Sequence, residues 1–151
     1  MSEFEVKEVR PRTAAAVRSE VPADRIREVF DRGFPAVMRA LSASGATVVG
    51  PPFGYYPRAP GDTIEVVVGF PVDREIAPTG EVVPFTLPGG RVVSTVHVGP
   101  YSGLGNTYRR LVEWAEGQGL TLAEGMWESY VTDPGTAPPS EWLTEITWPL
   151  A

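Results

Sequence analysis

Hydrophobic positions follow two periods along the chain, first that of a strand and then that of a helix. From Val6 to Val21, small and β-branched residues predict an extended segment that Pro11 interrupts, which a strand tolerates only at an edge or a bulge. From Ala23 onward the apolar residues recur at helical spacing, on one face made of Ile26, Val29, Phe30, Val37 and Leu41.

Residues that suit helix ends mark the limits of this first helix. Pro22 and Asp24 favour a start at that point, and Gly45 favours a stop. Gly33 and Pro35 lie inside the helix, where a flexible residue and a missing N–H are expected to bend or split it.

Two strands are predicted after the helix. The first covers residues 51–56, where Pro51 and Pro52 argue against a central strand that is hydrogen-bonded on both sides. The second covers residues 63–71, with one apolar face made of Ile64, Val66 and Val68.

The same order of elements then returns. Residues 73–90 are rich in proline and glycine and are predicted to be a linker with one short strand from Val82 to Phe85. Beyond the linker the pattern predicts a strand, a helix and two further strands, at residues 91–98, 102–118, 126–132 and 143–150.

The two halves also end alike. Gly69-Phe70-Pro71-Val72 matches Thr147-Trp148-Pro149-Leu150 at an offset of 149 − 71 = 78 residues. A tandem duplication within one domain, residues 1–151, with pseudo-repeats 6–72 and 91–150, is the simplest account. The predicted fold class is therefore α+β: a repeated strand-helix-strand-strand module whose antiparallel sheets meet along a shared seam, around a central ligand groove, with the helices outside.

Composition excludes several kinds of site. The 151 residues include no cysteine and a single histidine, His97, so thiolate chemistry is absent and neither a metal nor another cofactor is predicted. A net charge of −6 argues against nucleic acid as a partner and favours a cationic or neutral small molecule. Residues 1–5 lack the features of a signal peptide and no apolar run is long enough to span a membrane, which predicts a soluble, cytoplasmic protein.

One carboxylate stands out in the last predicted strand. Alternation of faces puts Glu145 on the same side as Leu143 and Thr147. Because an unpaired carboxylate is costly to desolvate, a glutamate on such a face either has a partner or awaits a ligand. The alternative is a half-exposed face on which Glu145 is a solvated edge residue.

Three motifs in the second half are more specific than these patterns. They are His97-Val98-Gly99-Pro100-Tyr101, then Glu128-Ser129-Tyr130-Val131-Thr132-Asp133-Pro134, and then Thr144-Glu145-Ile146 followed by Pro149. In this order they resemble the GyrI-like family of small-molecule effector-binding domains, which occur behind DNA-binding modules in AraC-type and MerR-type regulators and as free-standing proteins. The resemblance covers nearly the whole chain, and without a helix-turn-helix segment it implies a free-standing member.

The resemblance implies a groove that binds bulky hydrophobic, often cationic compounds, with the glutamate of the Thr-Glu-Ile strand at its floor. That glutamate corresponds to Glu145. Aromatic residues near strand ends are the candidates for the walls: Phe53, Tyr55, Tyr101, Trp127, Tyr130 and Trp148. Trp127 and Tyr130 lie three positions apart and therefore on opposite faces of a regular strand, so only one of them is expected to line the groove, with Trp127 slightly favoured.

The resemblance leaves three functions open. The first is binding for sequestration or sensing; the second is hydrolysis of reactive cyclopropane-containing toxins, with Glu145 and a tyrosine, Tyr130 or Tyr55, as catalytic residues. The third is a protein partner such as gyrase. His97 is interpreted as a structural residue that hydrogen-bonds near the Gly99-Pro100 turn, rather than as a catalytic base. Glu128 is expected to pair with an arginine and is assigned no chemistry.

Overall fold

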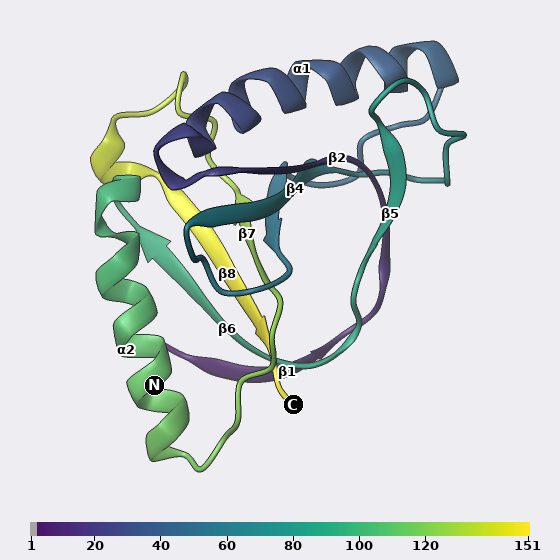
Figure 1. The fold of residues 1–151 in the computed structure, drawn as a ribbon. Coiled ribbons are helices and arrows are strands. Elements are labelled where there is room, and N and C mark those ends of the chain that lie inside the picture. The colour runs from purple at the N-terminus through teal and green to yellow at the C-terminus, as the bar shows by residue number, and fades with distance from the viewer. Residues whose placement is uncertain (1–2) are drawn as a thin grey trace.

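The computed structural model describes residues 3–151, which form one eight-stranded antiparallel sheet that curls into a half-barrel, with two long helices against it (Figure 1). In Figure 1, α1 lies across the top and α2 along the left side. The elements in chain order are β1 (Glu5–Val9), β2 (Arg12–Pro22), η1 (Ala23–Arg25), α1 (Ile26–Ser44), β3 (Phe53–Tyr56), β4 (Thr63–Pro71), β5 (Val83–Leu87), β6 (Gly90–Val98), η2 (Tyr101–Gly103), α2 (Leu104–Gly117), β7 (Met126–Tyr130), η3 (Pro139–Glu141) and β8 (Leu143–Pro149).

The middle of the sheet is the pairing of β3 with β7. The strand order is β1-β6-β8-β7-β3-β4-β2-β5, so each half of the chain supplies three adjacent strands that meet at this seam. β3 is hydrogen-bonded to β7 on one side and to β4 on the other, so the expectation that Pro51 and Pro52 would keep this segment out of the centre is wrong. Both prolines precede the strand, and neither removes a ladder N–H from it.

The extended segment predicted from Val6 to Val21 is two strands. Pro11 separates β1 from β2, and the two strands lie in opposite halves of the sheet. β1 pairs with β6, whereas β2 pairs with β4 and β5. The short strand expected in the linker is β5, an edge strand whose Pro84 is acceptable because one side of it is unpaired in the sheet order.

The two edge strands are exchanged between the halves. The first residues of β1 and β5, Glu5 and Val83, are 78 positions apart, and so are their last residues, Val9 and Leu87. β1 is followed in sequence by β2 but pairs with β6, and β5 is followed by β6 but pairs with β2. Each half therefore completes the sheet of the other.

Further hydrogen bonds recur at the same spacing. Val72 N–H donates to Thr13 O over 3.0 Å, and Leu150 N–H donates to Arg91 O over 2.9 Å. Both members of the second bond lie 78 positions after those of the first. In the sheet order, the neighbours of β8 are β6 and β7, which both belong to the second half. This is the pattern that the predicted duplication requires, although the duplication itself remains a prediction.

Helix α1 is continuous from Ile26 to Ser44 in spite of Gly33 and Pro35, so the expectation of a split is wrong. Gly33 has a packing role, since a Cβ at this position would collide with a methyl group of Val68 on β4. The helix ends as predicted at Gly45, which adopts a left-handed φ of 75° and donates its N–H to Leu41 O over 2.9 Å.

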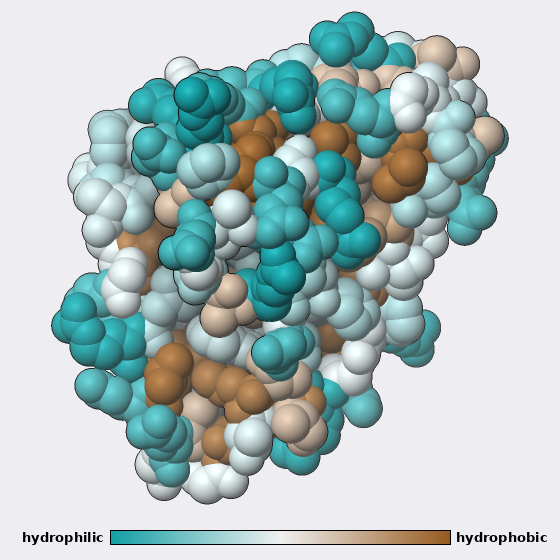
Figure 2. Space-filling view, viewed as in Figure 1, coloured by the Kyte–Doolittle hydropathy of each residue, from teal (hydrophilic) through white to brown (hydrophobic). Residues whose placement is uncertain are grey.

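The two faces of the sheet carry separate cores. The helix face packs against α1 through Ala15, Val17, Val66 and Val68 and against α2 through Val93 and Ile146. The opposite, inner face of the curl holds Ala14, Ala16, Phe53, Val67 and Trp127. On the outside of the molecule, apolar side chains are interleaved with hydrophilic ones on the face shown in Figure 2.

A glycine on β4 provides a test of this packing. A Cβ on Gly69 would collide with the backbone oxygen of Ala15 on β2, so Gly69→Ala is expected to lower the free energy of unfolding by about 2–3 kcal/mol. Gly61 is the matched control, because a Cβ added there would have no atom within 4 Å. Gly61→Ala is expected to stay within about 0.5 kcal/mol of the parent in urea denaturation. Equal effects of the two substitutions would show that β2 and β4 are further apart at Gly69 than the structure places them.

Candidate functional site

The residues predicted to line one groove are divided between the two faces of the sheet. The inner face holds Phe53, Tyr55, Trp127 and Glu145. The helix face holds Trp148, which contacts Tyr108 of α2, and Tyr130, which contacts Tyr101. Trp127 and Tyr130 thus lie on opposite faces, as predicted, but the seven residues do not surround a single site.

Glu145 lies on β8 directly opposite Val96 of β6 and Ser129 of β7. Its side chain is 38% exposed, and its Oε2 atom lies 3.9 Å from Nζ of Lys7 on β1. A partly exposed pair of this kind contributes about 1 kcal/mol or less to stability. Glu145 is therefore neither a buried unpaired carboxylate nor an edge residue, because β8 is paired on both sides.

The inner aromatic residues pack on one another as core. Tyr55 contacts Phe85 and Trp127 with ring centroids 5.3 and 6.0 Å apart, and Phe53 is fully buried. Burial raises the pKa of Tyr55, and the charge of Arg18 partly offsets this shift. These contacts stabilise the seam from the inner side.

A second carboxylate, Glu128 of β7, is buried on the helix face and is only 6% exposed. The Tyr130 hydroxyl donates to Glu128 Oε1 over 2.7 Å, and the Tyr108 hydroxyl donates to Glu128 Oε2. The expectation that Glu128 pairs with an arginine is wrong, because the ion pairs among residues 3–151 do not involve Glu128. A buried carboxylate is held here by phenol groups instead of by a cation.

The β3–β7 seam creates the space for this carboxylate. Glu128 is directly opposite Gly54 in the ladder. A Cβ on Gly54 would lie 2.9 Å from the Tyr130 hydroxyl oxygen and 3.0 Å from the Phe30 ring. Only a residue without a side chain leaves room at this point for both the tyrosine and the ring, so Gly54 is a part of the site that the sequence patterns missed.

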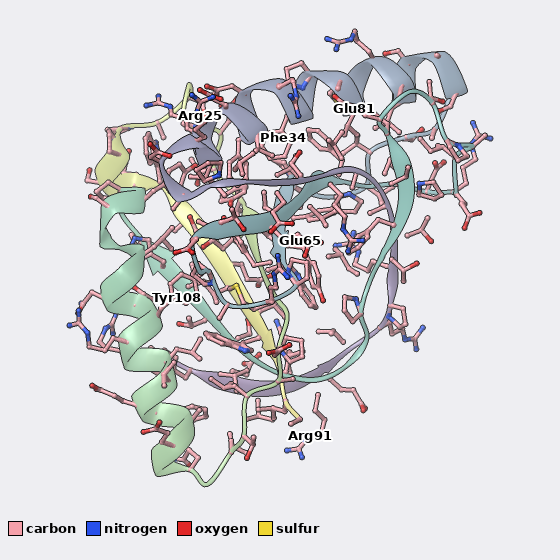
Figure 3. All side chains as sticks on the ribbon, in the orientation of Figure 1. Arg25, Phe34, Glu65, Glu81, Arg91 and Tyr108 are labelled. Carbon is pink, nitrogen blue, oxygen red and sulfur yellow. The ribbon has the colours of Figure 1, made fainter. Side chains whose placement is uncertain are left out.

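Aromatic rings from two elements, α1 and η2, surround Tyr130. Phe30 and Phe34 of α1 contact it with ring centroids 5.8 and 6.4 Å apart, and Tyr101 of η2 contacts it at 5.8 Å. Trp142 then covers Tyr101 at 4.9 Å. Figure 3 shows that Phe34 and Tyr108 project from α1 and α2 on the sides of the helices that face the sheet.

The electrostatics of the cluster follow from this burial. Desolvation raises the pKa of Glu128, although hydrogen bonds from Tyr108 and Tyr130 act in the opposite direction, as would a positive charge on His97. The pKa of Tyr130 is raised well above its ordinary value, first by burial and then by the charge of Glu128. The two tyrosines therefore keep their protons and donate hydrogen bonds to the carboxylate, and either a proton or a cation can neutralise Glu128.

His97 supports the turn beside this cluster. Its Nε2 lies 2.9 Å from Pro100 O and its Nδ1 lies 2.7 Å from Thr107 Oγ1 of α2. Because a carbonyl oxygen only accepts, Nε2 carries the hydrogen and Nδ1 accepts from the threonine hydroxyl. The predicted structural role of His97 near the Gly99-Pro100 turn is confirmed.

The alternation of faces could have found Glu128 in the sequence. Residues 128 and 130 are two apart on one strand, so their side chains share a face, and the motif that contains both already made Tyr130 a candidate. What the sequence lacked was the depth of burial, which comes from α2 and from the pairing with Gly54.

Residues 3–151 lack the groupings typical of a metal site and of a membrane-spanning helix. This part of the chain contains no group of three or more histidine, aspartate or glutamate side chains placed to hold a metal ion. None of its helices is both long enough and apolar enough to cross a membrane.

Comparison with solved structures gives the fold. The C-terminal domain of EcmrR superposes with a TM-score of 0.82 at 24% identity, over 98% of this chain and 96% of that one. In the EcmrR–DNA complex the match has the same TM-score and identity over 97% of this chain but 56% of that chain, so this chain spans about half of that EcmrR chain. SAV2435, solved bound to tetraphenylphosphonium, superposes with a TM-score of 0.67 at 9% identity, over 99% of this chain and 94% of its own.

A hydrolase from Listeria innocua also superposes, with a TM-score of 0.67 at 18% identity, over 98% of this chain and 91% of that one. At these identities the solved structures establish the fold alone. No curated protein matches the chain. The GyrI-like small molecule binding domain matches residues 2–151, and the chain belongs to this family.

Proposed function

We propose that this domain binds a bulky hydrophobic cation between its two helices and the sheet, with the carboxylate of Glu128 as the counter-charge. The observation that carries the proposal is a buried glutamate whose hydrogen-bond donors, within residues 3–151, are two tyrosine hydroxyls. Such a carboxylate is expensive to ionise without a cation nearby. A cationic ligand supplies the missing charge.

The rings around Glu128 suit the same ligand. The faces of Phe30, Phe34, Tyr101 and Tyr130 offer apolar contact and the negative potential of the aromatic ring, which attracts a cation. These rings are in contact with one another, so a bulky ligand enters by parting them. Sequestration or sensing requires binding alone and no further chemistry.

Two relatives support a cation as ligand and a regulatory setting as one use of the fold. SAV2435 was solved bound to tetraphenylphosphonium, a bulky hydrophobic cation. EcmrR carries this fold in a complex with DNA. For this chain, only the binding step is proposed.

The predicted ligand contact of Glu145 remains a separate hypothesis. Glu145 lies on the inner face, beside Lys7 and opposite Ser129, whereas Glu128 lies on the helix face. Because the two carboxylates are on different faces, substitutions of each one separate the two hypotheses.

Glu128→Gln is expected to weaken binding of tetraphenylphosphonium by about ten- to a hundredfold, the scale of a desolvated charge contact. The binding of neutral tetraphenylmethane derivatives of the same shape is expected to change by less than about threefold, since they make no charge contact. Isothermal titration calorimetry or dye displacement measures both affinities.

Glu145→Gln is the matched control, since it removes the same charge from the other face. It is expected to leave both affinities within about twofold, because a partly exposed pair is screened by solvent. A large loss of affinity in Glu145→Gln with none in Glu128→Gln would show that the cation binds on the inner face instead.

The raised pKa of Glu128 predicts a pH dependence. Below the ordinary glutamate pKa of about 4.3 the residue is protonated in both folded and unfolded chains. As the pH rises from there through the raised folded-state pKa, the unfolded chain loses its proton first, so the folded state loses stability. We therefore expect the stability of the parent to fall relative to that of Glu128→Gln over this interval, as measured by urea denaturation from about pH 4 to 8.

The same linkage acts on binding with the opposite sign. A cation binds best to ionised Glu128, so its affinity is expected to rise with pH over that interval and to level off above it. Parallel stability curves for the parent and Glu128→Gln would show that the carboxylate is not held in its protonated form by burial.

Hydrolysis is the second candidate, and one contact favours it. The Tyr130 hydroxyl and the Glu128 carboxylate are 2.7 Å apart, which is a suitable arrangement for general acid–base chemistry. A structural neighbour from Listeria innocua is a hydrolase. In this version the catalytic carboxylate is Glu128, whereas Tyr55 and Glu145, the catalytic candidates that the family resemblance implied, lie on the inner face.

Tyr130→Phe separates binding from hydrolysis, since it removes a hydroxyl and keeps the ring. A binder is expected to retain its affinity for tetraphenylphosphonium within about tenfold. An enzyme that uses this hydroxyl would lose about a hundredfold or more in turnover of a cyclopropane-containing electrophile while still binding it. Tyr55→Phe, on the inner face, is the control. Multiple turnovers in the parent that disappear in Tyr130→Phe alone would favour the enzyme.

A further inference from the structure

One buried polar atom beside Glu128 has no partner. Thr144 of β8 is completely buried, and no group within residues 3–151 hydrogen-bonds its Oγ1 atom. Buried hydroxyls normally have a partner, and an exception usually marks the position of a water molecule or a ligand atom. Thr144 begins the Thr144-Glu145-Ile146 motif, directly before Glu145.

The strand register places Thr144 on the helix face next to the Glu128 cluster. Thr144 is directly opposite Tyr130 of β7 and directly opposite His97 of β6. Residues opposite each other in an antiparallel ladder share a face, with Cβ atoms about 5 Å apart. Glu128 is opposite Ile146, so it is the diagonal neighbour of Thr144, at a typical separation of about 7–8 Å.

The neighbouring polar groups are already engaged with other partners. Tyr130 donates its hydroxyl hydrogen to Glu128, and His97 uses both ring nitrogens, one with Thr107 and one with Pro100. The Thr144 hydroxyl is therefore left with hydrogen-bonding capacity that residues 3–151 do not use, on the wall of the proposed cation site.

We propose that Thr144 is a second polar contact of the Glu128 site and selects a cation that also carries a hydrogen-bonding oxygen or nitrogen. When no ligand is bound, we expect a single water molecule at this position. The inference rests on the proposed function, because Glu128 supplies the charge contact. It adds a ligand class: a compact aromatic cation whose polar group lies about one ring width from the charge, to match the diagonal spacing of the two residues.

Two probes of nearly equal shape test this selection. They are (3-hydroxyphenyl)trimethylammonium and (3-methylphenyl)trimethylammonium, which differ only in a hydroxyl against a methyl group. The parent is expected to favour the hydroxyl probe by about three- to tenfold, the scale of one neutral hydrogen bond. Calorimetry on the full chain measures both affinities.

Thr144→Val keeps the shape of the side chain and removes its hydroxyl, so the preference is expected to fall below about twofold while the methyl probe binds as before. Thr144→Ser keeps a hydroxyl and is expected to retain the preference. Thr147→Val is the matched control, because Thr147 is a buried threonine on the same strand whose side chain points to the inner face. It is expected to leave the preference unchanged.

The possible results separate the inference from the proposed function. If the methyl probe binds and depends on Glu128, but the parent shows no preference or Thr144→Val keeps it, only the role of Thr144 is overturned. If neither probe binds, the proposed function fails and the inference fails with it.

A crystal structure decides the question without a variant, should Thr144→Val not fold. The expected result is a water molecule bonded to Thr144 Oγ1 in the free protein, replaced by the oxygen of the hydroxyl probe in the complex. A Thr144 hydroxyl that is bonded within the chain in both crystals would overturn the inference.

Discussion

The pairing of β3 with β7 is the contact on which both the fold and the site depend. It joins the two halves into one sheet, and it sets Gly54 opposite Glu128 at the centre of that sheet. Glycine on one strand leaves room for the Tyr130 hydroxyl and the Phe30 ring beside the carboxylate of the other. The strands that hold the protein together therefore also create the place where a buried charge is tolerated.

The exchange of edge strands reinforces this seam. β1 and β5 each pair with the half of the chain to which they are not directly joined, so separation of the halves would break the outer ladders as well as the central one. The core on the inner face, with Phe53 and Trp127 from the two central strands, adds apolar contact at the same place. A site at a seam that is supported on both faces is held in position by the whole sheet.

The helix face has a different character from the inner face. It combines a buried carboxylate, two tyrosine donors and rings from α1 and η2, and these groups come from both halves of the chain. The cost of burying Glu128 is offset in part by the two hydrogen bonds and not by a positive charge. Thr144, with its unused hydroxyl, belongs to the same face. An incomplete polar cluster among rings is the reason for the proposal that a ligand binds on this face.

Much of the fold followed from the sequence alone. The period of the hydrophobic residues and the residues typical of helix ends were enough to predict the first helix and its stop at Gly45. They also predicted the strand at 63–71 and the four elements after residue 90, because these signals are local. The family resemblance added the GyrI-like fold, and the match over residues 2–151 confirms it. Each strand pairs with segments that are distant in the sequence, so the separation of β1 from β2 and the central place of β3 were not predicted.

The candidate site, like the fold, could be predicted from the sequence only in part. Alternation along β7 correctly put Trp127 and Tyr130 on opposite faces, since that depends on strand geometry only. The choice between Glu128 and Glu145 depended on what covers each face. Helix α2 brings Tyr108 onto Glu128, whereas β1 brings Lys7 to a partly exposed Glu145. Burial is a property of elements that meet from distant parts of the chain, so tertiary structure alone decided which carboxylate is desolvated.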